Sequence, residues 1–113
     1  AASAKDTNWA EIDLLYQVLE RLSPSPVVTL NRAVAVSKAK GAGEGLLLLE
    51  PLGEALDGYF YFHGVRGALL AQAGETRAAR DAFGRAIALA NSPAEAAHIR
   101  QELDRLQDER PAP

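Results

Sequence analysis

The chain has 113 residues, of which 48% are hydrophobic, so it is long enough for one small domain with a modest core. Its formal net charge is -3 with acidic and basic residues interspersed, which argues against direct nucleic-acid contact by this segment. The absence of cysteine excludes disulfides and thiol chemistry and fits a reducing cytoplasm.

Membrane insertion is not expected, because the longest run of consecutive leucines, Leu46 to Leu49, is far shorter than a membrane span. No signal-peptide pattern precedes the first predicted helix. We therefore expect a cytoplasmic protein without membrane contact. The chain contains no methionine, and we expect it to be a segment of a longer protein.

Residues 1–7 are small and polar and are expected to form a linker or disordered lead-in to one helical domain at 8–110. The first helix is predicted to begin after Asn8, which can cap it together with Glu11 three positions later. Apolar residues then recur at helical spacing: Ile12, Leu15, Leu19 and Leu22. Proline at two of the next four positions ends this helix and begins another after a short turn.

The second predicted helix follows this turn, and its sequence is SPVVTLNRAVAVSK, from Ser25 to Lys38. Ser25 can accept a hydrogen bond at the N-cap, Pro26 suits the first helical position, and Gly41 ends the helix. Its valines would also suit a strand, but the stretch is longer than most strands, so we predict a helix. Because it is apolar on most sides, we expect neighbours to pack around it.

Two more helices are expected in the middle of the chain. A short third helix is predicted at residues 44–50 and is limited by Pro51. A fourth is predicted at residues 58–73, with Asp57 as its N-cap.

The last two helices are predicted from the residues that begin and end them. The fifth should cover residues 76–90 and is rich in alanine on one face. The sequence SPAE, beginning at Ser92, is a capping box that opens a sixth helix extending to about Arg110. The final residues, 111–113, are expected to be disordered.

The middle of the chain contains an internal repeat. Five positions of the second and third predicted helices match five positions of the fourth and fifth at a fixed offset of 34 residues: Ala33, Val36, Gly45, Leu49 and Leu52 match Gly67, Leu70, Ala79, Phe83 and Ala86. Small residues at two of these positions would let the two helices of each hairpin approach closely.

The second copy resembles a tetratricopeptide (TPR) repeat, since six of its residues fall at that family's signature positions: Gly67, Leu70, Gly74, Ala79, Phe83 and Ala86. Asn91 stands where this family usually has proline, and the first copy has a displaced glycine. We predict an all-α, TPR-like α-solenoid of about six antiparallel helices. Two 34-residue hairpins would be flanked by an N-terminal half-repeat helix and a C-terminal capping helix.

No catalytic or metal-binding set is recognised. The two histidines, His63 and His98, lack an HExxH-like spacing, and no Gly-x-Ser-x-Gly elbow occurs. We therefore expect no enzymatic activity, no cofactor and no metal. His63 is interpreted as a half-buried aromatic residue rather than a ligand.

Arg32 and Arg66 occupy the same position of the repeat, where a TPR helix usually carries an apolar residue. In the favoured interpretation, each side chain lies along apolar surface and pairs with a carboxylate or a helix C-terminus. In the alternative, the two guanidinium groups recognise an acidic partner segment. The amide of Asn31 likewise needs a partner, either a backbone group or a bound peptide.

The groove of the repeat would be lined by the following residues: Val27, Leu30, Val34 and Ser37 in the first copy, and Tyr61, Gly64, Ala68 and Gln72 in the second. This groove could be open to solvent, filled by other parts of a longer chain, or used for homodimerisation. The candidate protein-interaction residues are Asn31, Arg32, Tyr61, His63, Arg66 and Gln72.

Several stretches together resemble the C-terminal extension of a group of bacterial extracytoplasmic-function (ECF) sigma factors. The stretches are NWAEIDLLYQVLERLSPSPVVTLNRAVAV, LLLLEPL, the tyrosine-rich run ending at His63, and RAARDAFGRAIALANSPAE. The resemblance extends from about Thr7 to Leu106, and SPVVTLNRAVAV is its most specific part. Gly64 departs from the alanine expected after the histidine.

This resemblance implies a regulatory module of a sigma factor that contacts the sigma domains of the same chain or RNA polymerase and so modulates transcription initiation. The DNA-binding and polymerase-binding regions would lie upstream of the segment. A stand-alone TPR adaptor that binds a peptide of a partner protein is the alternative.

Overall fold

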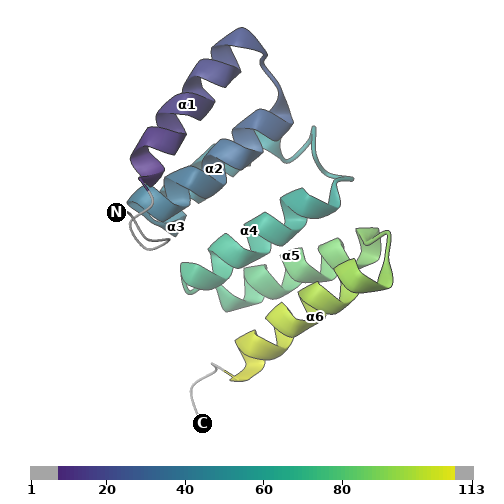
Figure 1. Cartoon of the computed structure of the whole chain (residues 1–113). Coiled ribbons are helices and arrows are strands. Elements are labelled where there is room, and N and C mark those ends of the chain that lie inside the picture. Colours follow the sequence, from purple (N-terminus) through teal and green to yellow (C-terminus); the bar gives the residue numbers. More distant parts are fainter. Residues whose placement is uncertain (1–7, 109–113) are drawn as a thin grey trace. The chain divides into compact units, whose positions relative to one another are not determined.

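The structure is a computed structural model that describes residues 8–108. The secondary structure of this range is helical, which confirms the all-α prediction for the described residues (Figure 1). The elements are α1 (Trp9–Leu22), α2 (Pro26–Lys40), α3 (Ala42–Leu49), the 3-10 helix η2 (Glu50–Leu52), α4 (Phe60–Gln72), α5 (Thr76–Leu89) and α6 (Pro93–Asp108). The predicted lead-in at 1–7 and tail at 111–113 lie outside the described residues.

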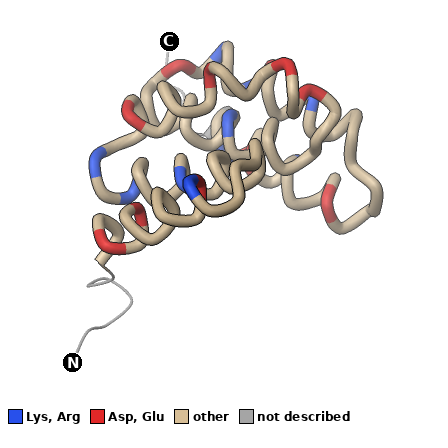
Figure 2. Tube along the Cα trace, turned by 90° about the horizontal axis from the view of Figure 1, so that it is seen from above, with Lys and Arg blue, Asp and Glu red and all other residues tan. Residues whose placement is uncertain are grey.

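The chain divides into two compact units, Ala1–Gly53 and Glu54–Pro113, here called unit 1 and unit 2. The described part of unit 1 holds α1, α2, α3 and η2, and that of unit 2 holds α4, α5 and α6. Both units carry acidic and basic residues (Figure 2). That residues 8–110 form one domain stays a prediction.

In unit 1, the two predicted helix starts are confirmed by their caps. The Asn8 side chain accepts a hydrogen bond from the Glu11 N–H at 3.0 Å, and Ser25 Oγ accepts one from the Val27 N–H at 3.2 Å. Both side chains satisfy backbone donors that the helix itself leaves without partners. Helix α2 packs against α1 on one side and α3 on another, as expected for a helix that is apolar on most sides.

The third helix differs from its predicted limits of 44–50. It begins at Ala42, because Gly41 ends α2 and at the same time precedes the first residue of α3. Gly41 has a φ of 106°, a conformation that side chains with a Cβ rarely adopt, and this allows the sharp change of direction. The α-helical part stops at Leu49, and Pro51 lies in the 3-10 turn that follows.

In unit 2, α4 and α5 form an antiparallel hairpin, and α6 lies alongside it and packs against both (Figure 1). One of the two hydrogen bonds of the predicted capping box of α6 is present, because Ser92 Oγ accepts from the Glu95 N–H at 3.1 Å. Glu95 Oε1 in turn accepts from the backbone N–H of Asn91 at 2.8 Å. These bonds fix the turn between α5 and α6.

The prediction that Asp57 caps a helix at 58–73 is wrong. Helix α4 begins at Phe60, and Tyr59 precedes it without a side-chain cap. Asp57 is engaged elsewhere: its carbonyl oxygen lies 2.6 Å from His63 Nε2, and its carboxylate lies 3.3 Å from Arg85 Nη2. These contacts hold the turn before α4 against α4 and α5.

The repeat correctly identifies buried positions in both units. All ten residues matched at the 34-residue offset are buried. In unit 2, Gly67 of α4 lies directly against the Phe83 ring of α5, which is 1% exposed. The small residue at this position therefore does permit the close helix contact that the repeat predicted.

Candidate functional site

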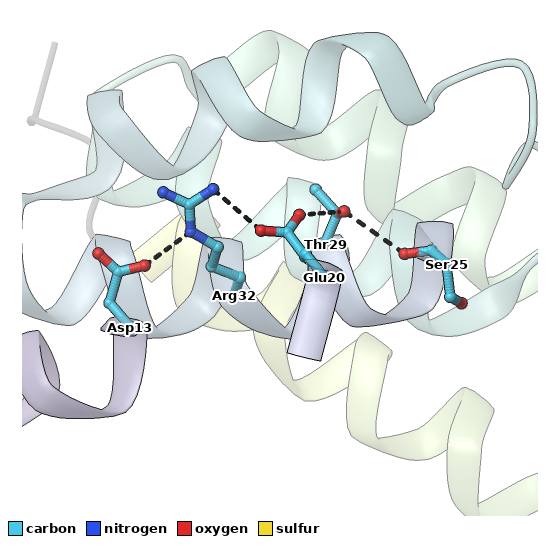
Figure 3. Close-up of polar contacts among 5 residues, drawn as sticks. All are labelled: Asp13, Glu20, Ser25, Thr29 and Arg32. Atoms are coloured by element: carbon cyan, nitrogen blue, oxygen red, sulfur yellow. Dashed lines mark hydrogen bonds and ion pairs between the residues drawn. The ribbon is translucent and has the colours of Figure 1, made fainter. Parts of the chain in front are cut away.

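A polar cluster joins α1 to α2. Arg32 Nε of α2 donates a hydrogen bond to Asp13 Oδ1 of α1 at 2.7 Å, and Arg32 Nη1 donates to Glu20 Oε1 at 3.1 Å (Figure 3). Thr29 Oγ1 donates to the other carboxylate oxygen of Glu20 at 2.6 Å, and it lies 3.4 Å from the Ser25 carbonyl oxygen. The cluster places two carboxylates around one guanidinium group.

This geometry gives Arg32 the favoured structural role. Asp13 is 5% exposed, and a buried carboxylate is strongly unfavourable without a partner of opposite charge. The hydrogen bond to Asp13 raises the pKa of Arg32, with burial acting in the opposite direction and the charges of Asp13 and Glu20 adding to the increase. Arg32 therefore stays protonated and holds α1 on α2.

The opposite side of α1 is apolar and exposed. Its large hydrophobic residues, here called the α1 stripe, are Leu14 (60% exposed), Leu15 (61%), Val18 (51%), Leu19 (45%) and Leu22 (77%). The periodicity of the sequence correctly predicted a helix here, but three of the four spaced residues that define it face solvent. Contiguous exposed apolar surface of this kind is typical of a contact site for another protein.

A shallow hollow of about 260 Å³ lies on this surface. It is lined by Ile12, Leu15, Tyr16 and Leu19. Leu15 and Leu19 belong to both the hollow and the α1 stripe. An apolar side chain of a partner could therefore pack into the hollow while the rest of the partner covers the α1 stripe.

Unit 2 has a larger hollow of about 410 Å³ between α4 and α6, here called the first hollow. Its lining includes all four groove positions predicted for the second copy: Tyr61, Gly64, Ala68 and Gln72. Further lining residues are Phe60, Val65, Phe83, His98, Ile99, Glu102 and Arg105. The floor is apolar, and the rim carries groups that can form hydrogen bonds.

The charges around the first hollow largely offset one another. Arg105 Nη1 lies 3.6 Å from Glu102 Oε2, one turn apart on α6. His98 is exposed on the same helix. Because the two charged groups form their own pair, the first hollow has no excess charge that would select an ionic ligand.

A second hollow of about 430 Å³ adjoins the first and shares Phe60 and Tyr61 with it. Its other lining residues are Gly58, Tyr59, Leu89, Asn91 and Glu95. The rings of Tyr59 and Tyr61 meet edge to face with their centroids 6.3 Å apart. Glu95 is the one acidic residue among these lining residues, and the lining includes no lysine or arginine.

His63 is buried rather than half-buried, at 7% exposed. Its Nε2 atom lies 2.6 Å from the Asp57 carbonyl oxygen, and its ring makes an edge contact with Phe62. A carbonyl oxygen only accepts hydrogen bonds, so Nε2 must carry the hydrogen. His63 therefore anchors the turn before α4 and does not reach either hollow.

The remaining candidates are not brought together. Asn31 and Arg66 are partly buried, and neither forms a side-chain hydrogen bond or ion pair with the residues that the structure describes. Arg66 therefore lacks the carboxylate partners of its repeat equivalent Arg32. Of the six candidate residues, Tyr61 and Gln72 share one site, the first hollow.

Sequence reasoning did not identify the acidic partners of Arg32, or the residues that line the hollows of unit 2 beyond the four predicted groove positions. Asp13 carried a usable signal, since it is a carboxylate placed directly between the apolar residues Ile12 and Leu14. The residues that α6 contributes to the first hollow had no such signal, because α6 lies outside both copies of the repeat from which the groove positions were predicted.

No group of three or more metal-ligating side chains is found among residues 8–108. None of the described helices has the length and apolar character needed to cross a membrane.

Comparison with known proteins identifies a relative of this chain. An uncharacterized protein of Rhizobium meliloti (strain 1021) is 62% identical to this chain over 109 residues, which cover 96% of the chain and 26% of the relative. The chain thus spans about a quarter of that protein's length. No family model and no solved structure matches the chain.

Proposed function

We propose that this chain is a TPR-like regulatory module of an ECF-type sigma factor and acts by contacting other protein surfaces rather than by catalysis. The α1 stripe is the observation that carries the proposal. Five large apolar residues of one helix are at least 45% exposed, and covering them with another polypeptide would remove a substantial apolar area from water.

The way α1 is attached supports this role. Its ion pairs with α2, from Asp13 and Glu20 to Arg32, lie on the side of α1 away from the α1 stripe. That attachment leaves the apolar side available without any rearrangement of the helix. A rigid helix presenting an apolar ridge is a common way of binding a complementary groove or helix.

The sigma-factor part of the proposal comes from the sequence resemblance. It is compatible with the Rhizobium meliloti relative, in which the matched segment is about a quarter of the protein. The sigma domains of the same chain and RNA polymerase are the proposed partners, and the cytoplasm is the proposed location. Modulation of transcription initiation would follow from holding or releasing those partners.

The test uses the Rhizobium meliloti relative with its matched segment replaced by this chain. Transcription from a promoter that depends on the relative would be measured for this chimera, for a deletion of the segment, and for a Leu15→Glu/Leu22→Glu variant. The control is Gln101→Glu, which adds the same kind of charge at an exposed position of α6.

We expect the deletion and the α1 double variant to change transcription in the same direction, with the control unchanged. The proposal is wrong if all four proteins accumulate, fold and support equal transcription. It is also wrong if the rest of the relative contains no helices with the pattern of sigma regions 2 and 4.

A stand-alone adaptor that binds a peptide remains the alternative, and the first hollow favours it. Its lining includes the four positions where a TPR-like groove would be expected. In that case the chain would bind a peptide through unit 2 without influencing transcription.

A further inference from the structure

We propose that the second hollow of unit 2 is a binding site for a basic side chain, arginine in preference to lysine, of a partner polypeptide. The inference deepens the proposed function, because it assumes that the module binds protein segments and specifies the chemistry of one of them.

The aromatic part of the site consists of Tyr59 and Tyr61. They lie on either side of the start of α4, and about two-fifths of each residue is exposed (40% and 41%). A guanidinium or ammonium group over a tyrosine ring is attracted by the negative face of the ring. Arginine is preferred at such sites because its planar head also stacks on the ring.

The acidic part of the site is Glu95, at the first turn of α6. One of its carboxylate oxygens, Oε1, accepts the Asn91 N–H at 2.8 Å, and this bond fixes the orientation of the side chain. The other oxygen forms no hydrogen bond with the described residues. A held carboxylate beside two exposed rings can therefore accept a charge-assisted hydrogen bond from a cation.

The charge of the residues that line the second hollow favours a ligand of positive charge. Glu95 is the one charged group among the residues that line the second hollow. In the neighbouring first hollow, Glu102 and Arg105 pair with each other and contribute no net charge. A cationic side chain would neutralise Glu95, whereas an acidic one would face it without compensation.

The two hollows share part of their lining, and this indicates which kind of residue would lie next to the basic residue in a bound segment. Phe60 and Tyr61 line both, so a bound segment can occupy them together. The first hollow has an apolar floor that includes Val65 and Ile99. A segment with an apolar residue close to an arginine would thus place one side chain in each hollow, with the arginine stem against Leu89.

The experiment titrates the isotope-labelled 113-residue chain with short synthetic peptides and follows amide and tyrosine-ring signals by NMR. Each peptide carries one leucine and one arginine separated by zero to three glycines. Matched peptides replace the arginine by citrulline, which has the same shape without the charge, by lysine, or by glutamate.

We expect the best arginine peptide to shift the ring signals of Tyr59 and Tyr61 and the amide of Gly58. It should bind about five-fold more tightly than its citrulline counterpart, the size of effect expected for one cation–π contact and one half-exposed ion pair. The lysine peptide should lie between the two, and the glutamate peptide should be weakest. Added salt should reduce the difference between arginine and citrulline.

Two variants locate the effect. Glu95→Gln keeps an amide oxygen able to accept the Asn91 N–H but removes the charge, and it should abolish most of the preference for arginine over citrulline. Asp104→Asn makes the same change of charge at an exposed position of the same helix outside both hollows, and it should leave the preference intact. Tyr59→Leu supplies a second test should Glu95→Gln perturb the start of α6.

Equal binding of the arginine and citrulline peptides would overturn the inference, as would absence of binding by every arginine peptide at millimolar concentration. Ring shifts confined to residues outside the second hollow would do the same. None of these results bears on transcription by the chimera, so failure of this inference and failure of the proposed function are distinguishable.

Discussion

The Phe83 ring of α5 occupies the space beside Gly67 of α4 that a side chain at residue 67 would otherwise fill. A Cβ at residue 67 would lie 2.6 Å from both Cδ1 and Cε1 of the ring, a separation that real Cβ atoms do not adopt. Phe83 is also one of the largest fully buried side chains of the chain. The α4–α5 hairpin therefore depends on glycine at this position for its packing, not for its backbone conformation.

Gly67→Ala should accordingly destabilise the chain despite alanine's better helix propensity. We expect a loss of about 1–3 kcal/mol, the usual cost of forcing extra atoms into a packed core. The measurement is chemical denaturation followed by circular dichroism. Gly84→Ala is the matched control, since nothing lies within 4 Å of a Cβ there, and it should raise stability by about 0.5–1 kcal/mol. Equal effects of the two substitutions would contradict this account of the hairpin.

The ion-pair cluster of unit 1 leads to a second prediction. Arg32→Met should lower the free energy of unfolding by about 3 kcal/mol, because it leaves Asp13 buried without its partner. Arg66→Met, at the equivalent repeat position, should cost less than about 1 kcal/mol, since Arg66 has no ion pair with a described residue.

Adding Asp13→Asn to Arg32→Met should restore part of the loss, because the unpaired charge is then removed. Because the pKa of Arg32 is raised above that of an arginine in the unfolded chain, the contribution of Arg32 to the free energy of unfolding is fully present below the unfolded-chain pKa and is lost only above it. As far as it depends on the titration of Arg32, the difference in the free energy of unfolding between the native chain and Arg32→Met should therefore be constant between about pH 6 and 9. If the double variant is no more stable than Arg32→Met, then the loss of stability in Arg32→Met does not come from leaving the Asp13 carboxylate without a partner.

The two histidines should differ in tautomer. The contact of His63 Nε2 with the Asp57 carbonyl requires a hydrogen on Nε2, so the neutral ring should be almost entirely the Nε2–H form. Exposed His98 should show a mixture of both tautomers. Nitrogen-15 chemical shifts of the imidazole rings measure this directly, and an Nδ1–H form at His63 would rule out the proposed anchor of the turn.

The helices of this chain were predictable because their starts and stops are local. Ser25 with Pro26 and the Ser92 capping box act within a few residues, and the structure places α2 and α6 where these signals indicate. The buried repeat positions were predictable for a related reason, since a period of 34 residues selects the same faces in both copies. Asp57 misled the prediction because its partners are not local: Arg85 lies 28 positions further along the chain.

The candidate site was less predictable than the fold. Four positions of the first hollow followed from the repeat, but the opposite wall belongs to α6, which is not part of either repeat copy. The difference between Arg32 and Arg66 was also hidden, since it depends on whether an acidic neighbour such as Asp13 lies opposite. Such pairs follow from the packing of two helices and not from the periodicity of one.

The α1 stripe should matter for association and hardly at all for stability. Leu15→Gln and Leu22→Gln change residues that are 61% and 77% exposed, so each should alter the free energy of unfolding by less than about 1 kcal/mol. Leu49→Ala, at a residue 2% exposed in α3, is the contrasting case and should cost about 2–5 kcal/mol. The glutamine variants should at the same time bind less of a dye that reports exposed apolar surface. A large loss of stability in Leu22→Gln would show that the stripe is needed to hold the chain's own fold and is not a free contact surface.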